Sequence, residues 1–67
     1  MVDINKLKGK LVEKKKTYEG AAKAIGISVT AFNNKMQGRS MFDCAEAVIL
    51  GDWLGLTNEE KVDIFLR

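Results

Sequence analysis

Apolar residues recur at helical spacing in five stretches of the chain, and short polar or glycine-containing turns separate these stretches. In the first stretch, Ile4, Leu7, Leu11 and Val12 fall at positions i, i+3, i+7 and i+8, which is one face of a helix. The five expected helices cover residues 4–16, 18–25, 29–37, 44–54 and 58–66. The pattern therefore predicts an all-α protein, a compact five-helix domain that spans residues 1–67.

Residues that begin or end helices stand at the borders of these stretches. A side-chain oxygen just before a helix can accept one of its unpaired backbone N–H groups, and the expected N-caps of this kind are Asp3, Thr17, Ser28 and Asp43. Thr57 and Glu60 match the S/T-x-x-E capping box before the last helix. Glycine tolerates a positive φ and often follows a helix, so we expect helix ends at Gly26, Gly38 and Gly55.

The stretch from residue 17 to residue 38 predicts two short helices joined by a tight turn. Gly26 and Ser28 supply the turn and the next N-cap, while Ala22 lets the two helix backbones approach closely. Phe32 and Met36 lie on one face of the second helix and are expected to pack inward. Two helices joined in this way form a helix-turn-helix, a motif that sets its second helix into the major groove of DNA.

The fourth expected helix is the most apolar of the five. Cys44, Val48 and Leu54 form its predicted inner face, which Ile49 and Leu50 widen, so we predict that it is the most buried helix. A lone cysteine in such a pattern is more often a small core residue than a nucleophile.

Two features near the end of the chain leave alternatives open. Trp53 either completes the core or lies exposed as an anchor in an interface. In the last helix the cluster Ile64–Leu66 is broader than one buried stripe requires. The surplus apolar surface is available for a contact between two copies of the chain.

Composition limits the chemistry that the chain can perform. Sixty-seven residues make one small domain, which buries only about 60% of its unfolded surface and is marginally stable. Histidine is absent, and we find no glycine-rich phosphate loop or metal-ligand cluster, so we predict no enzyme activity, no cofactor and no metal site. Cys44 is the only cysteine, which suits a reducing cytoplasm. We expect a cytoplasmic protein, because no apolar run of membrane-spanning length and no signal peptide is evident.

Charge is distributed unevenly along the sequence. Residues 1–42 contain nine basic and three acidic residues, whereas residues 43–67 contain two basic and six acidic residues. The basic part includes the predicted helix-turn-helix, which suits binding of a polyanion. The lysines between residues 6 and 16 either form an ordinary solvated helix surface or include a phosphate contact.

Four side chains form an outward stripe on the second helix of the motif. Val29, Thr30, Asn33 and Asn34 stand at positions i, i+1, i+4 and i+5. Asparagine can pair with N6 and N7 of adenine, and the methyl groups of Thr and Val can contact the thymine methyl. The stripe therefore predicts base contacts with a preference for A·T-rich half-sites, unless these asparagines are simply tolerated on an exposed helix.

Six positions of the motif follow the order A-xxx-G-I-S-xxx-F-xxxxx-G: Ala22, Gly26, Ile27, Ser28, Phe32 and Gly38. This pattern resembles the helix-turn-helix of the phage repressor and Cro family, and the layout of nearly all 67 residues is similar to that family's five-helix domain. The chain departs from it at Gly20 and Ala21, where bulkier helix formers are more usual. A glycine inside a helix costs about 1 kcal/mol relative to alanine.

The resemblance implies a sequence-specific, double-stranded DNA-binding regulator of transcription, in a bacterium or in the host of a phage. In the family, residues at the start of the first motif helix hold the DNA backbone, which implies that role for Thr17 and Tyr18. Tyr18 can instead be a surface aromatic that covers Leu11 or Ala22. The full set of expected phosphate contacts is Thr17, Tyr18, Ser28, Lys35, Arg39 and Ser40.

One domain of this size reads only a few base pairs, so we expect a weak homodimer on paired half-sites about 34 Å apart. The expected pairing surface is Trp53 with Phe65 and Leu66, although Phe65 can also be a plain core residue. The alternative function is a small helical protein–protein interaction module without specific DNA binding. We expect no membrane partner and find no sign of a small-molecule ligand.

Overall fold

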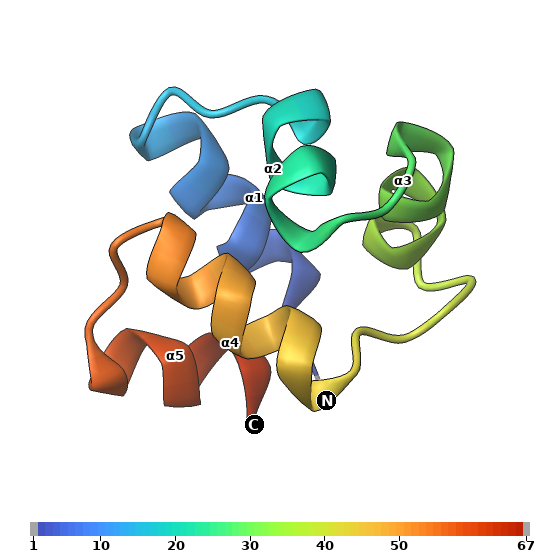
Figure 1. The fold of residues 1–67 in the computed structure, drawn as a ribbon. Coiled ribbons are helices and arrows are strands. Elements are labelled where there is room, and N and C mark those ends of the chain that lie inside the picture. Colours follow the sequence, from blue (N-terminus) through green and yellow to red (C-terminus); the bar gives the residue numbers. More distant parts are fainter. Residues whose placement is uncertain (1, 67) are drawn as a thin grey trace.

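The computed structural model describes residues 2–66, and this part of the chain forms five helices and no strand. The helices are α1 (Ile4–Glu13), α2 (Tyr18–Ile25), α3 (Val29–Met36), α4 (Cys44–Trp53) and α5 (Asn58–Phe65). In Figure 1, α4 lies between α2 and α5, and α1 lies behind them. The predicted all-α, five-helix class is confirmed.

Every predicted N-cap forms the expected hydrogen bond. The side chains of Asp3, Thr17, Ser28, Asp43 and Thr57 each accept the backbone N–H of the residue three positions later, at 2.7–3.1 Å. The Thr57 capping box is completed by Glu60, whose Oε1 accepts the Thr57 N–H at 2.9 Å. Asp43 forms a second capping box with Glu46, which was not predicted. Each such cap stabilises its helix by about 1 kcal/mol.

Helix α1 ends three residues earlier than predicted. Its last residue is Glu13, and Lys15 takes a positive φ of 56°. The N–H groups of Lys15 and Lys16 donate back to the carbonyls of Val12 and Leu11, which closes the helix end. Lys14, Lys15 and Lys16 therefore lie in the turn before α2. The other predicted helix ends are confirmed, because Gly26, Gly38 and Gly55 have positive φ values of 79°, 80° and 69°.

The core is centred on Phe32, which is fully buried together with Leu7 and Leu50. The Tyr18 ring meets the Phe32 ring edge-to-face with centroids 5.2 Å apart, and Phe42 meets Phe32 at 5.8 Å. The chain of aromatic contacts continues to Phe65 in α5 at 6.5 Å. It ties α2, α3, the segment after α3 and α5 into one core.

The burial predicted for the fourth helix is correct for Leu50 and Leu54, which are 0% and 2% exposed, and wrong for the other residues of its predicted inner face. Only Leu50 and Gly51 are buried within this helix, whereas Val48 is 57% and Ile49 is 45% exposed. Cys44 is exposed as well, because it stands in the first turn directly after the Asp43 cap. Apolar residues occur all round α4, so their spacing did not indicate which side faces the core. Val12 of α1, also predicted to face inward, is 78% exposed.

Trp53 is half-buried and packs against the core. A Cβ atom added at Gly20 would lie 3.3 Å from the Trp53 ring, so the glycine leaves room for the indole. The Lys16 ammonium lies 5.0 Å from the centre of the same ring. Gly20 therefore lets α4 approach α2 closely.

Candidate nucleic-acid interface

Helices α2 and α3 form a close-packed pair joined by a three-residue turn. Gly26 takes the left-handed conformation, and the Ile27 N–H donates to the Ala22 carbonyl at 3.0 Å. Ser28 then caps α3. Ala21 and Ala22 are buried, at 0% and 2% exposure, where larger side chains would separate the helices. This local geometry agrees with the predicted helix-turn-helix.

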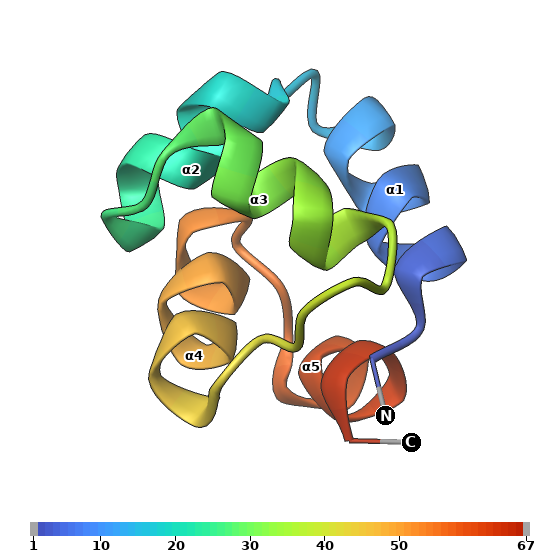
Figure 2. The ribbon, with the colours of Figure 1, turned by 90° about the vertical axis from the view of Figure 1, so that its right-hand side faces the viewer.

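Helix α3 has a buried side and an exposed side. Phe32 and Met36 are buried beneath it. Thr30 and Asn33 are exposed on the other side, Val29 is 45% exposed and Asn34 is half-buried. Figure 2 shows α3 across the front of the molecule, with α2 behind it. The four residues of the predicted stripe are thus accessible to a ligand that approaches this face.

The polar side chains of this stripe have no intramolecular partner. Within residues 2–66, the side chains of Thr30, Asn33 and Asn34 neither donate nor accept a hydrogen bond. Their donors and acceptors are therefore available to a ligand.

Gln37 adjoins the candidate site but was not predicted as part of it. Gln37 is the exposed C-cap of α3 and stands four residues after Asn33, on the same side of the helix. That spacing, within the expected helix 29–37, was a usable signal. Met41, 82% exposed in the segment after α3, also lies outside the predicted set, and its spacing gave no signal.

Five of the six predicted phosphate contacts remain accessible. Arg39 and Ser40 are exposed in the segment between α3 and α4, and the Arg39 N–H donates to the Asn34 carbonyl at 2.9 Å. Thr17 and Ser28 are exposed N-caps, and a hydroxyl that accepts a backbone N–H still has its own hydrogen to donate. Tyr18 is half-buried, and its ring packs against Phe32.

Lys35, the sixth predicted contact, is engaged inside the protein. Its ammonium donates to the Met41 carbonyl at 2.8 Å and pairs with the Glu46 carboxylate at 3.1 Å. The side chain is only 14% exposed. This arrangement does not fit a phosphate contact, because the charge is already neutralised and shielded.

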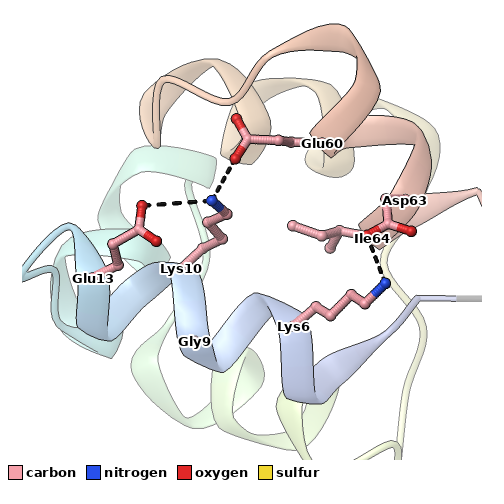
Figure 3. Close-up of a pocket in the computed structure, with 7 residues that line it drawn as sticks. All are labelled: Lys6, Gly9, Lys10, Glu13, Glu60, Asp63 and Ile64. Atoms are coloured by element: carbon pink, nitrogen blue, oxygen red, sulfur yellow. Dashed lines mark hydrogen bonds and ion pairs between the residues drawn. The ribbon is translucent and has the colours of Figure 1, made fainter.

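Two lysines of α1 are paired with the acidic helix α5 (Figure 3). Lys6 meets Asp63 at 2.6 Å, and Lys10 pairs with Glu60 and, at 3.5 Å, with Glu13. The hydrogen bond from Lys10 lowers the pKa of Glu60 to about 2, with help from the Thr57 backbone N–H, and the same bond raises the pKa of Lys10. These groups line an open cleft of about 360 Å³. Because the lysines and carboxylates pair with one another, we interpret them as a structural link between α1 and α5.

The remaining basic residues carry the charge that a polyanion can meet. Within residues 2–66, no ion pair involves Lys8, Lys14, Lys15, Lys16, Lys23 or Arg39. Three of these lysines occupy the turn just before α2, whose beginning includes Thr17. In Figure 2 this turn is at the top of the same view that shows α3 in front.

Two residues of the predicted pairing surface, Phe65 and Leu66, line the same groove, and Trp53 lies outside it. Phe65 is 8% exposed and belongs to the core, which was the stated alternative, whereas Leu66 is 72% exposed. Leu66 lines an apolar groove of about 310 Å³ with Cys44 and Val48, near the start of α4. Trp53 is at the other end of this ten-residue helix, which is about 15 Å long. The groove beside Leu66 and the Trp53 side chain are therefore at opposite ends of α4.

Comparison with protein-family models, curated proteins and solved structures finds no match to this chain. In the described part of the chain, no helix has the length and apolar character needed to cross a bilayer. Among residues 2–66, no three His, Cys, Asp or Glu side chains are grouped so that they could hold a metal ion.

Proposed function

We propose that this protein is a sequence-specific, double-stranded DNA-binding regulator of transcription, of the small phage repressor or Cro type, that acts in the cytoplasm of a bacterium. The observation that supports the proposal best is the two-sided character of α3. Phe32 and Met36 hold one side in the core, and on the other side the side chains of Thr30, Asn33 and Asn34 have no hydrogen bond within residues 2–66.

In this proposal α3 enters the major groove and reads bases. Asn33 and Asn34 pair with adenine, and the methyl groups of Val29 and Thr30 contact thymine. Gln37 extends the reading surface by one helical turn, since glutamine pairs with adenine in the same way. The expected half-site is therefore rich in A·T pairs.

The flanking residues hold the DNA backbone. Arg39 and Ser40 follow α3, while Thr17 and Tyr18 begin α2, and Ser28 caps α3. Such contacts position the protein and do not specify the base sequence. The exposed lysines 14–16 add long-range attraction near the beginning of α2, so affinity falls steeply as the salt concentration rises.

Two copies bind paired half-sites about 34 Å apart, because one domain offers too few base contacts for specificity in a genome. The exposed Leu66 and Val48 supply the apolar contact between the copies. Leu66→Glu is the matching test: the variant should keep half-site affinity and lose cooperative binding to a two-half-site operator. Wild-type cooperativity in a folded Leu66→Glu protein would place the contact elsewhere.

Selection of bound sites from random duplex DNA tests the function directly. A shared, A·T-rich sequence that occurs in two spaced copies is the expected result. Asn33→Ala or Thr30→Ala should then weaken specific binding by about 1–3 kcal/mol and leave binding to random duplex nearly unchanged. Equal losses on both duplexes would exclude base reading by α3.

The groove beside Leu66 favours one alternative, a protein–protein interaction module. An interaction module is expected to select no sequence and to show no dependence on the α3 stripe. The same selection experiment separates the two functions.

A further inference from the structure

The segment between α3 and α4, residues 37–43, presents Arg39 and Ser40 at the surface. It has no regular secondary structure, and Gly38 turns it with a φ of 80°. At its beginning, the Gly38 and Arg39 N–H groups donate to the Lys35 and Asn34 carbonyls. These bonds fix where the segment leaves α3 and do not reach its second half.

Lys35 holds that second half through its side chain. Its ammonium donates to the Met41 carbonyl at 2.8 Å and lies 5.8 Å from the centre of the Phe42 ring. The pair between Lys35 and Glu46 is shielded, with the two side chains 14% and 15% exposed. An ion pair in such a site is screened less by salt than one at the surface.

Glu46 connects the same ammonium to the beginning of α4. Its Oε1 accepts the Asp43 N–H at 3.0 Å and also faces the Lys35 ammonium, while the Asp43 carboxylate accepts the Glu46 N–H at 2.7 Å. The end of α3, the segment and the first turn of α4 are thereby joined by one network of charge-assisted bonds.

We propose that Lys35 and Glu46 are positioning residues that hold residues 37–43 in the conformation that presents Arg39 and Ser40 to DNA phosphates. The DNA part rests on the proposed function. By electrostatics alone, loss of an acidic side chain strengthens binding to a polyanion. Removing the negative charge of Glu46 should weaken binding to a polyanion, because the segment that carries Arg39 loses its anchor.

Glu46→Gln tests this consequence, and Glu60→Gln is its matched control. Both glutamates complete a capping box and pair with a lysine, but Glu60 lies in α5 and pairs with Lys10. Glutamine keeps an oxygen for the cap in both variants. We expect Glu46→Gln to weaken duplex binding by about three- to tenfold, the effect of a partly lost charge-assisted contact. Glu60→Gln should leave affinity unchanged or raise it.

A double-mutant cycle of Lys35 and Arg39 shows whether Lys35 positions Arg39 or contacts phosphate itself. In the wild-type background, Arg39→Ala should lower the slope of log K against log salt by about one unit. In a Lys35→Met background the same change should have little further effect. If Lys35 touches phosphate itself, the two effects will add, and Glu46→Gln will bind as tightly as Glu60→Gln; this pair of results would overturn the proposal.

Cleavage of the free protein tests the anchor without DNA. Arg39 and Arg67 are the two arginines of the sequence, so an arginine-specific protease cuts inside the domain only after Arg39. Lys35→Met and Glu46→Gln should each raise that cleavage rate several-fold at a temperature where circular dichroism shows all proteins folded, and Glu60→Gln should not. Equal rates in all four proteins refute the anchor. If wild-type protein binds no duplex, the proposed function fails, and the cleavage rates still decide whether the anchor exists.

Discussion

Phe32→Leu is the change that tests most directly how α3 is held. Phe32 is fully buried, and its ring makes edge-to-face contacts with Tyr18 at 5.2 Å and with Phe42 at 5.8 Å. Each such contact contributes about 0.5–1.5 kcal/mol beyond the area it buries. Leucine keeps the site apolar but loses both contacts and fits the space less well. We expect a loss of about 2–4 kcal/mol in the free energy of unfolding.

That loss is large for so small a protein. A chain of 67 residues has a total stability of about 3–10 kcal/mol. In this size range 1 kcal/mol corresponds to about 4–8 °C in Tm, so Phe32→Leu should lower Tm by about 10 °C or more. Thermal unfolding followed by circular dichroism measures the change, with urea unfolding at 25 °C as the second method.

Asn33→Ala is the matched control from the exposed side of the same helix. The Asn33 side chain has no hydrogen-bond partner within residues 2–66, so its removal should change stability by less than about 0.5 kcal/mol. The two variants should therefore differ in what they lose. Phe32→Leu should lose stability, and Asn33→Ala should lose specific DNA binding. A Tm decrease of less than about 5 °C in Phe32→Leu would refute the central position of Phe32 in the core.

Three further predictions concern single side chains. Arg39→Ala should weaken binding to every duplex sequence and lower the salt slope by about one unit; an unchanged slope would exclude a phosphate contact. Cys44 is exposed, so a thiol reagent should modify it in the folded protein at a rate close to that of a free thiol; a reaction that waits for unfolding would contradict its exposed position. The pKa of Glu60 is lowered from 4.5 to about 2, chiefly by the hydrogen bond from Lys10, so its contribution to stability is complete above pH 4.5 and is lost as the pH falls toward 2. Glu60→Gln should remove that part of the acid dependence, and acid unfolding curves of both proteins measure it.

Local sequence signals determined where the helices begin and how α2 joins α3. Thr17, Ser28 and Thr57 cap their helices as predicted, because a cap bonds to a backbone N–H only three residues away. The positive φ of Gly26 is equally local. The outward stripe of α3 followed from the spacing of Phe32 and Met36, since two buried anchors on a short helix define its opposite face.

Tertiary structure alone decided which apolar and charged groups are covered. Helix α4 has apolar residues on every side, so only its packing between α2 and α5 could show that Val48 is exposed and Leu50 buried. The Trp53 ring packs where Gly20 has no side chain, and Gly20 lies on a helix more than thirty residues earlier in the chain. Lys35 belonged to a basic segment by sequence, yet Glu46 approaches it only after the segment folds back onto α4. Periodicity reports one helix at a time, whereas burial and ion pairing depend on which helices meet in space.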